Sequence, residues 1–247
     1  MVHFLTKSDE PNELETHYLT VRRLEGRVLD DMGVLALPEV SSLNAKHKEW
    51  KWRSRTFRRF VNYLKGRYKS NICILDLGCG NGWMSNRMAE NSAWDVWGVD
   101  VNMEELEQAD RLFSRENLQF YFGQVSAGVL PELYFDVIVL AASIQYFSDF
   151  SQLIIALKRS LKQGGEIHII DSPFYVNTEQ QAKARLRTIN YYEKMGVPEM
   201  AAFYHHHLRN DAIGAGAIDR NNNFPVMALQ KLKYLAPFPW MVFKKPG

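Results

Sequence analysis

Three glycines and one acid stand close together in this 247-residue chain and could form a cofactor site. The apolar run 72–77 ends in Gly78, Gly80 and Gly82, which predicts a buried strand, a tight turn and the start of a helix. Glycines let the backbone come close to a ligand, while the free N–H groups of a helix start point outward. The carboxylate of Asp76, two residues before the first glycine, would repel a phosphate and attract a cation. The pattern therefore favours a ligand with ammonium or sulfonium charge.

The spacing of the glycines, G-x-G-x-G, differs from the G-x-G-x-x-G of dinucleotide-binding enzymes and disfavours a nicotinamide oxidoreductase. A second acid, Asp100, ends the predicted strand 94–100, roughly 20 residues after the glycines, where a βαβ unit has a ribose-binding acid. Residues 75–82, with the sequence LDLGCGNG, resemble the first motif of class I S-adenosylmethionine-dependent methyltransferases. This resemblance implies S-adenosylmethionine as the cofactor and S-adenosylhomocysteine as its product.

The resemblance also implies individual cofactor contacts. Asp76 would reach the methionine amino group, Asp100 would hold the ribose hydroxyls, and Val101 and Val125 would border the adenine. Gln124 stands where the family commonly has an aspartate, but its amide oxygen can still accept a hydrogen bond from the adenine amino group. The expected cofactor-binding residues are Asp76, Gly78, Cys79, Gly80, Asn81, Gly82, Asp100, Val101, Gln124, Val125 and Ala141.

Apolar runs that alternate with helical patterns predict an α/β fold with a mostly parallel sheet. Beyond the first two strands, we expect strands at 118–122, 135–142 and 166–171, a weak strand near 212–218 and an antiparallel strand at 240–244. The prediction is a doubly wound, Rossmann-like, seven-stranded mixed sheet with its last strand antiparallel. The residues expected to bind a ligand follow the carboxyl ends of these strands, which is where open α/β sheets bind ligands.

The two ends of the chain depart from the minimal fold. Residues 1–45 are expected to form an N-terminal extension, with a loose polar start at 8–12, and residues 46–247 the methyltransferase domain. Helical patterns at 178–195 and 198–208 fall within 176–236, which we expect to contain a helical lid for the methyl acceptor, since insertions on a fixed scaffold usually carry specificity.

The segment 47–68 predicts an amphipathic helix, and the ten basic residues of 46–69 face a single acid, Glu49. In the family that the chain resembles, a helix at this place often lies over the cofactor. Trp50, Trp52 and Arg53 are therefore candidates for closing the site over the methionine portion. The alternative is a packed apolar face beneath a solvated basic face, and both interpretations stay open here.

The candidates for a general base are Tyr146, Asp171 and one of His205, His206 and His207. Tyr146 lies in a segment that resembles the family's post-strand region, which faces both cofactor and acceptor. Consecutive residues of a helix point in different directions, so the three histidines are not expected to bind one metal ion. One of them could act as a base because histidine titrates near neutral pH, or all three could lie on a polar helix surface.

Composition narrows the class of protein. The chain is 46% hydrophobic, has two cysteines and contains no apolar run of transmembrane length, which predicts a soluble, cytoplasmic protein. The expected lid and the aromatic content favour a small-molecule acceptor, with no nucleic acid partner and no membrane span. An RNA-directed methyltransferase and a non-catalytic S-adenosylmethionine-binding protein remain as alternatives. The acceptor atom, whether O, N, C or S, stays open.

Overall fold

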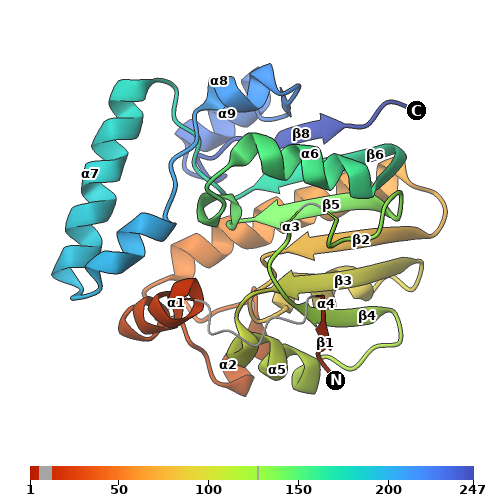
Figure 1. The fold of residues 1–247 in the computed structure, drawn as a ribbon, viewed down its shortest axis with the longest axis horizontal. Coiled ribbons are helices and arrows are strands. Elements are labelled where there is room, and N and C mark those ends of the chain that lie inside the picture. The colour runs from red at the N-terminus through yellow and green to blue at the C-terminus, as the bar shows by residue number, and fades with distance from the viewer. Residues whose placement is uncertain (6–12, 127) are drawn as a thin grey trace.

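The centre of the computed structural model is a mixed β-sheet (Figure 1). The structure describes residues 1–5, 13–126 and 128–247, so the polar run 8–12 lies outside the described residues. The strands are β1 (His3–Phe4), β2 (Ile72–Leu77), β3 (Trp94–Asp100), β4 (Leu118–Phe122), β5 (Phe135–Ala141), β6 (Leu161–Ile170), β7 (Ile218–Asp219) and β8 (Met241–Lys244). Their order in the sheet is β1-β4-β3-β2-β5-β6-β8-β7. β8 runs antiparallel to both of its neighbours, as predicted for the last strand.

The predicted doubly wound α/β fold is confirmed, but the described sheet has eight strands and the prediction of seven is wrong. The additional strand is β1, which pairs in parallel with β4 through His3 and Phe4. The weak strand expected over 212–218 is only the two residues of β7, because residues 209–214 form a short helix. Two-residue strands show no alternation of apolar and polar positions, so a search for periodicity misses them.

Helices cover both faces of the sheet. They are α1 (Glu13–Leu24), α2 (Asp31–Ala36), α3 (His47–Arg67), α4 (Trp83–Ala89), α5 (Met103–Leu112), α6 (Phe150–Ser160), α7 (Thr178–Lys194), α8 (Arg209–Gly214) and α9 (Phe224–Lys231), with 3-10 helices at Ile144–Tyr146 and Pro198–Phe203. α3, α4 and α5 share one apolar core with the sheet, whereas α6 packs into a second core on the opposite face. No helix among the described residues is long and apolar enough to cross a membrane.

The helix predicted over 198–208 is wrong beyond its first turns. The 3-10 helix ends at Phe203, and the three histidines lie in an extended segment before α8. Their backbone groups bond to neighbouring loops and not along a helix: His205 N donates to Gln145 O at 2.7 Å, and His207 O accepts from Tyr175 N at 3.0 Å. These cross-loop bonds satisfy the backbone, so a helix is not required here.

The carboxyl ends of β2, β3 and β5 point toward α1 and α7, which stand beyond this edge of the sheet (Figure 1). α1 and the 3-10 helix Pro198–Phe203 share a third apolar core that contains Val21, Tyr192 and Met200. The N-terminal segment and the helical insertion therefore meet above the sheet edge at which the glycine loop begins.

Candidate functional site

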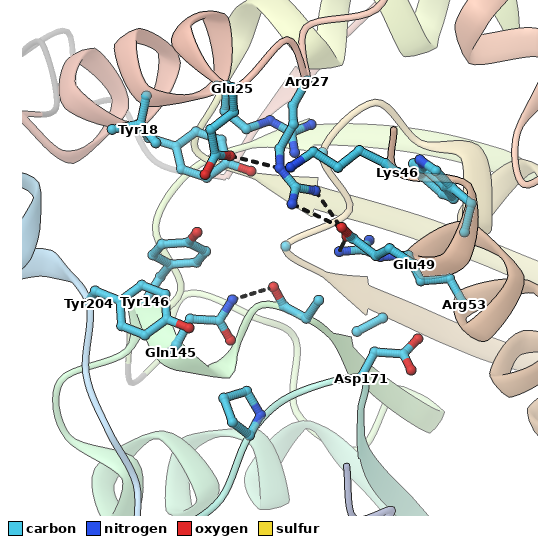
Figure 2. Close-up of a pocket in the computed structure, with 18 of the residues that line it drawn as sticks. Tyr18, Glu25, Arg27, Lys46, Glu49, Arg53, Gln145, Tyr146, Asp171 and Tyr204 are labelled. Atoms are coloured by element: carbon cyan, nitrogen blue, oxygen red, sulfur yellow. Dashed lines mark hydrogen bonds and ion pairs between the residues drawn. The ribbon is translucent and has the colours of Figure 1, made fainter. Parts of the chain in front are cut away.

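A cavity of about 690 Å³ lies at the carboxyl edge of the sheet. The glycine loop after β2 and the ends of β5 and β6 line it from the sheet, while α1, the first turns of α3, α7 and residues 236–238 supply the other walls. Figure 2 shows side chains from these separate segments arranged around an open centre. Segments from both ends of the chain therefore enclose the loop that the sequence singled out.

Packing leaves no room for a side chain at Gly78 or Gly82, but only Gly78 also lines the cavity. Gly78 and Gly82 have φ of 80° and 69°, and neither has room for a side chain. A Cβ on Gly78 would lie 2.4 Å from Cβ of Ser143, and one on Gly82 would lie 2.7 Å from the ring of Phe120. Gly78 lines the cavity, as do Cys79, Gly80 and Asn81, whereas Gly82 is not among the lining residues. Gly82 is thus required by packing between the loop and β4.

Asp76 is a buried carboxyl group in the wall of the cavity. Its side chain is 1% exposed, and Oδ2 accepts a hydrogen bond from Ser85 Oγ at 2.6 Å. Burial raises the pKa of Asp76 to about 7, and the nearby Asp100 adds to the effect. A buried carboxylate without a cation is unfavourable, so a positively charged ligand group in the cavity would stabilise its ionised form. The buried Asp76 carboxylate therefore fits the ammonium group of an amino-acid moiety.

Asp100 holds the glycine loop in place. Its Oδ2 accepts from Gly80 N at 2.7 Å, and its Oδ1 accepts from Asn102 N at 2.9 Å. Burial and the neighbouring Glu105 raise the pKa of Asp100 to about 6. Glu105 in turn accepts from Arg22 Nη2 of α1 at 2.6 Å. Each carboxylate oxygen of Asp100 keeps a further lone pair, so contact with ribose hydroxyls stays a prediction.

The residues expected to surround adenine are not among those that line the cavity. Gln124 is exposed, Val101 is half-buried, and Val125 is buried in the apolar core on the α6 face of the sheet. Ala141, at the end of β5, does line the cavity. The adenine contacts remain predictions from the resemblance.

Tyrosines form much of the wall opposite the glycine loop. The rings of Tyr18 and Tyr146 meet edge to face with centroids 5.3 Å apart, and those of Tyr146 and Tyr204 lie 5.9 Å apart. Burial raises the pKa of Tyr146 above its usual value, so its hydroxyl stays neutral near pH 7. The lining tyrosines are Tyr18, Tyr146, Tyr175, Tyr191, Tyr192 and Tyr204. Of these the sequence analysis had named only Tyr146, because no local spacing links residues on α1, α7 and the loops between.

Gln145 places an unsatisfied hydrogen-bond acceptor at the cavity. Its Nε2 donates to Ala142 O at 2.6 Å, which turns Oε1 away from that carbonyl. Oε1 is buried and has no hydrogen-bond partner among the residues that the structure describes. Buried amide oxygens normally have partners, so a bound molecule with an N–H or O–H group would complete this one. The sequence analysis did not single out Gln145.

Asp171 follows β6 and lines the cavity from the side opposite Tyr146 and Tyr204 (Figure 2). Its φ of 52° is left-handed, a conformation that non-glycine residues rarely adopt and that often marks functional sites. Burial raises the pKa of Asp171 to about 6, although the charge of Arg53 acts in the opposite direction. A carboxylate with this pKa can accept a proton near neutral pH.

The three side chains of α3 that were candidates for closing the site all line the cavity: Trp50, Trp52 and Arg53. Arg53 Nη2 lies 3.2 Å from Glu49 Oε1, and its guanidinium stacks 5.2 Å from the ring of Trp50. Glu49 also accepts two hydrogen bonds from Arg27, each 2.9 Å long. Arg27 and Arg53 are therefore already paired with an acid.

The histidines lie elsewhere: His205, His206 and His207 are not among the lining residues. His206 Nε2 lies 2.9 Å from Thr188 Oγ1, and His207 Nε2 lies 3.1 Å from Ile144 O. Burial lowers the pKa of all three imidazoles. Their placement supports a structural role, and because residues 204–207 are not helical, the alternative of a polar helix surface is also wrong. Within the described ranges, no group of three or more His, Cys, Asp and Glu side chains is arranged to hold a metal ion.

Comparisons with known proteins agree with this geometry. Residues 74–165 match the family described as "Methyltransferase domain". The chain is 26% identical over 98 residues to an uncharacterized methyltransferase of Mycobacterium tuberculosis, covering 40% of this chain and 49% of that protein. It is 30% identical over 119 residues to a ubiquinone biosynthesis O-methyltransferase of Pseudomonas putida, covering 47% of this chain and 48% of that protein. The chain thus spans about half the length of these curated relatives.

Solved structures share the fold over most of the chain. A complex between the Haloferax volcanii Trm112 methyltransferase activator and a putative methyltransferase matches with a TM-score of 0.59, at 14% identity, over 97% of this chain and 100% of that one. Geranyl diphosphate methyltransferase in complex with S-adenosylmethionine matches with a TM-score of 0.57, at 12% identity, over 86% and 95%. Residues 74–165, which contain the glycine motif, thus match the methyltransferase-domain family, and the chain as a whole shares the fold of solved methyltransferases.

Proposed function

We propose that this protein transfers a methyl group from S-adenosylmethionine to a small organic acceptor, and that both molecules occupy the cavity at the carboxyl edge of the sheet. One observation carries the proposal: a single cavity joins the glycine loop and buried Asp76 to a wall of tyrosines. Its volume, about 690 Å³, falls within the range of roughly 300–1,000 Å³ found for small-molecule sites.

The groups around the glycine loop fit the cofactor. Asp76 would face the methionine amino group, and the backbone of Gly78, Gly80 and Ala141 would border the same moiety. Asp100 would hold the ribose, with Gln124 near the adenine. When bound, S-adenosylmethionine supplies a methyl group activated by attachment to a positively charged sulfur.

The chain's own contribution would be positioning, exclusion of water and removal of a proton. The tyrosine rings and the walls from α1 and α7 would exclude water. Gln145 Oε1 would accept a hydrogen bond from the acceptor molecule, which would orient it. Asp171 would take up the proton if the methylated group is an O–H or N–H group, because its pKa near 6 leaves it mostly ionised at neutral pH.

A small acceptor is favoured over RNA. Walls from both ends of the chain surround the cavity, and Arg27 and Arg53 beside it are paired with Glu49, so they are not free to bind phosphates. The ubiquinone biosynthesis O-methyltransferases among the relatives also point to a small acceptor. The proposed setting is the cytoplasm, and the proposed organisation is an N-terminal extension over 1–45, a methyltransferase domain over 46–247 and an acceptor lid within 176–236.

Calorimetry with S-adenosylmethionine, S-adenosylhomocysteine and NAD tests the cofactor. We expect binding of the first two and none of NAD, and tighter binding of NAD would end the proposal. Incubation of cofactor labelled on its methyl group with a cell extract then tests the acceptor. Label in a small-molecule fraction supports the proposal, whereas label in RNA favours the RNA-directed alternative. Tight cofactor binding with no labelled product indicates a non-catalytic binding protein.

A further inference from the structure

The helix α9 presents apolar side chains to solvent, and none of its residues is buried. Phe224 is 85% exposed and Met227 is 45% exposed, while Leu232, just after the helix, is 76% exposed. Single exposed apolar residues are common, but a cluster of large ones on one short segment usually marks an interaction surface.

Contacts with α3 hold both ends of this segment. Arg59 Nη2 donates to Asn221 Oδ1 at 3.0 Å before α9, and Trp52 Nε1 donates to Lys233 O at 3.0 Å after it. The Arg55 guanidinium lies 3.7 Å from the centre of the Tyr234 ring. The exposed apolar residues therefore sit on a segment fixed at both ends.

Positive charge surrounds these apolar residues. From residue 220 to residue 247 the chain has five basic residues and no acid. On the outer face of α3, Lys48, Lys51 and Arg58 are exposed. Lys51, Arg58 and Tyr234 line one hollow, which also contains one acid, Glu39, so the basic face of α3 borders the end of the apolar segment. The basic residues next to the exposed apolar ones are thus Lys231 and Lys233 in sequence and Lys51 and Arg58 across the hollow.

We propose that this surface, formed by α9, residues 232–234 and the exposed basic side chains of α3, docks on the anionic face of a lipid bilayer. We call it the α9 surface. An interfacial helix inserts apolar side chains at the boundary between headgroups and acyl chains, while neighbouring lysines and arginines contact anionic headgroups. Nucleic acid would use the basic residues but would leave Met227 and Leu232 without a role.

The α9 surface also adjoins the cavity. Trp52 of α3 and Phe238, four residues after Tyr234, line the main cavity, so the segments that carry the surface also form part of the cavity wall. Docking itself does not depend on the methyl-transfer proposal, because it is measured with lipid and protein alone.

Vesicle flotation tests the proposal with the full chain and no cofactor. We expect the protein to float with vesicles of phosphatidylcholine and phosphatidylglycerol and to bind much less to phosphatidylcholine alone. Added salt should weaken binding, because it screens the charge on exposed lysines and arginines. Absence of binding to the anionic vesicles would overturn the proposal.

Two sets of variants assign the binding to the α9 surface. Phe224→Asp should lower the vesicle partition coefficient about tenfold, the loss expected when one large apolar side chain no longer inserts. Lys51→Glu with Arg58→Glu should lower binding to anionic vesicles by at least about 25-fold, taking about fivefold for each charge. Matched controls are Leu186→Asp, an exposed leucine of α7 (61% exposed), and Arg159→Glu, an exposed arginine of α6 on the other face of the sheet.

Controls that bind like the native protein, together with native circular dichroism spectra for all variants, support the α9 surface. Equal loss of binding in a control and in its matched variant would overturn it. Two further measurements test whether the α9 surface binds something other than a membrane. Binding to RNA that Phe224→Asp leaves unchanged, without vesicle binding, would indicate a nucleic-acid surface. Self-association that Phe224→Asp abolishes, without vesicle binding, would indicate a contact between copies of the chain.

Discussion

Three buried carboxyl groups share one physical property: burial raises their pKa values. Asp76 and Asp171 line the cavity, whereas Asp100 bonds to the glycine loop and is not among the lining residues. The value is about 7 for Asp76 and about 6 for Asp100 and Asp171. A carboxyl group taken out of water resists ionisation until a cation or a set of hydrogen-bond donors compensates it. The site without ligand therefore favours positive charge near the glycine loop, at Asp76, and proton uptake at Asp171, on the side of the cavity away from Tyr146 and Tyr204.

Replacement of Asp76 tests the first part. Because the pKa of Asp76 is raised from 3.8 to about 7, its contribution to the free energy of unfolding is full below 3.8 and is lost as pH rises through about 7. Cofactor-free protein should lose stability from about pH 4 to about pH 7, by up to about 1.4 kcal/mol per unit from this group. Asp76→Asn should lose less over the same window. Urea unfolding at both pH values measures this, and identical losses would contradict the assignment.

For Asp100 the expected effect is on cofactor affinity. Asp100→Ala should weaken binding of S-adenosylhomocysteine by about 1.5–3 kcal/mol for each charged hydrogen bond lost, less what water recovers. Asp100→Asn keeps one oxygen for Gly80 N or Asn102 N and should have a smaller effect. Calorimetry gives both values. An unchanged dissociation constant in Asp100→Ala would remove the ribose assignment.

Asp171 is expected to act on turnover alone. Asp171→Asn should lower the rate of methyl transfer on the order of 10²–10⁴-fold while leaving affinity for S-adenosylhomocysteine unchanged, because the group would act only on the acceptor. His206→Ala is the matched control, since His206 is another candidate base but does not line the cavity. Methyl transfer to the acceptor found in extract measures both. A larger loss for His206→Ala would return the base to the histidines.

At the scale of elements, α3 connects the two ends of the molecule. Its cavity side carries Trp50 and Arg53, and another side holds the C-terminal segment through Trp52, Arg55 and Arg59. Periodicity alone describes the basic face of α3 as solvated, but part of this face packs against the C-terminal segment of the same chain. Arginine suits this role because its planar guanidinium can stack on an aromatic ring and donate hydrogen bonds at the same time.

Loss of one such contact should loosen the segment around α9. Arg55→Met removes the stacking on Tyr234, worth about 0.5–2 kcal/mol, and the hydrogen bond to Tyr234 O. Hydrogen exchange should accelerate over residues 221–235 without change in the sheet. Arg58→Met, an exposed arginine one turn away, is the matched control and should leave exchange unchanged. Equal acceleration in both variants would mean that charge in general, and not this contact, holds the segment.

At the scale of the whole molecule, a buried polar cluster joins the helical layer to the antiparallel edge of the sheet. Glu166 and His168 of β6 are both fully buried. Tyr63 of α3 donates to Glu166 Oε2 at 2.7 Å, and Trp240 Nε1 donates to His168 Nδ1 at 3.1 Å. With Nδ1 accepting, the imidazole proton lies on Nε2, which is 3.3 Å from Glu166 Oε2. The cluster lies toward the start of β6, whereas Asp171 follows its end.

This cluster should stabilise the fold without affecting the site. Burial opposes ionisation of Glu166, but the neighbouring His168, the hydrogen bond from Tyr63 and the charge of Arg67 outweigh it and lower the pKa of Glu166 to about 2. Its stabilising contribution is present above the usual value of 4.5 and is lost as pH falls through about 2. Glu166→Gln should reduce the free energy of unfolding by about 1–3 kcal/mol at neutral pH, less near pH 3, with unchanged affinity for S-adenosylhomocysteine. A variant as stable as the native protein would contradict this.

Local patterns in the sequence determined the sheet and the loop. The apolar runs at 72–77, 94–100 and 118–122 became β2, β3 and β4 with the predicted bounds, and Asn102 caps α5 by accepting from Glu105 N at 3.1 Å. Strand alternation, glycine conformation and helix caps depend on residues within a few positions of one another, so a single sequence displays them. The five residues of 76–81 that line the cavity do so for the same local reason.

Tertiary structure alone decided what faces that loop. The tyrosines that line the cavity come from α1, from α7 and from the loops between them. The side-chain amide of Gln145 donates to Ala142 O, which leaves its oxygen without a partner among the described residues. The histidines do not line the cavity, because their backbone bonds to other loops. β1 joins the sheet through two residues, too few for any pattern. These arrangements depend on packing between segments far apart in the chain, and a periodic pattern reports which side of an element is apolar but not which distant element covers it.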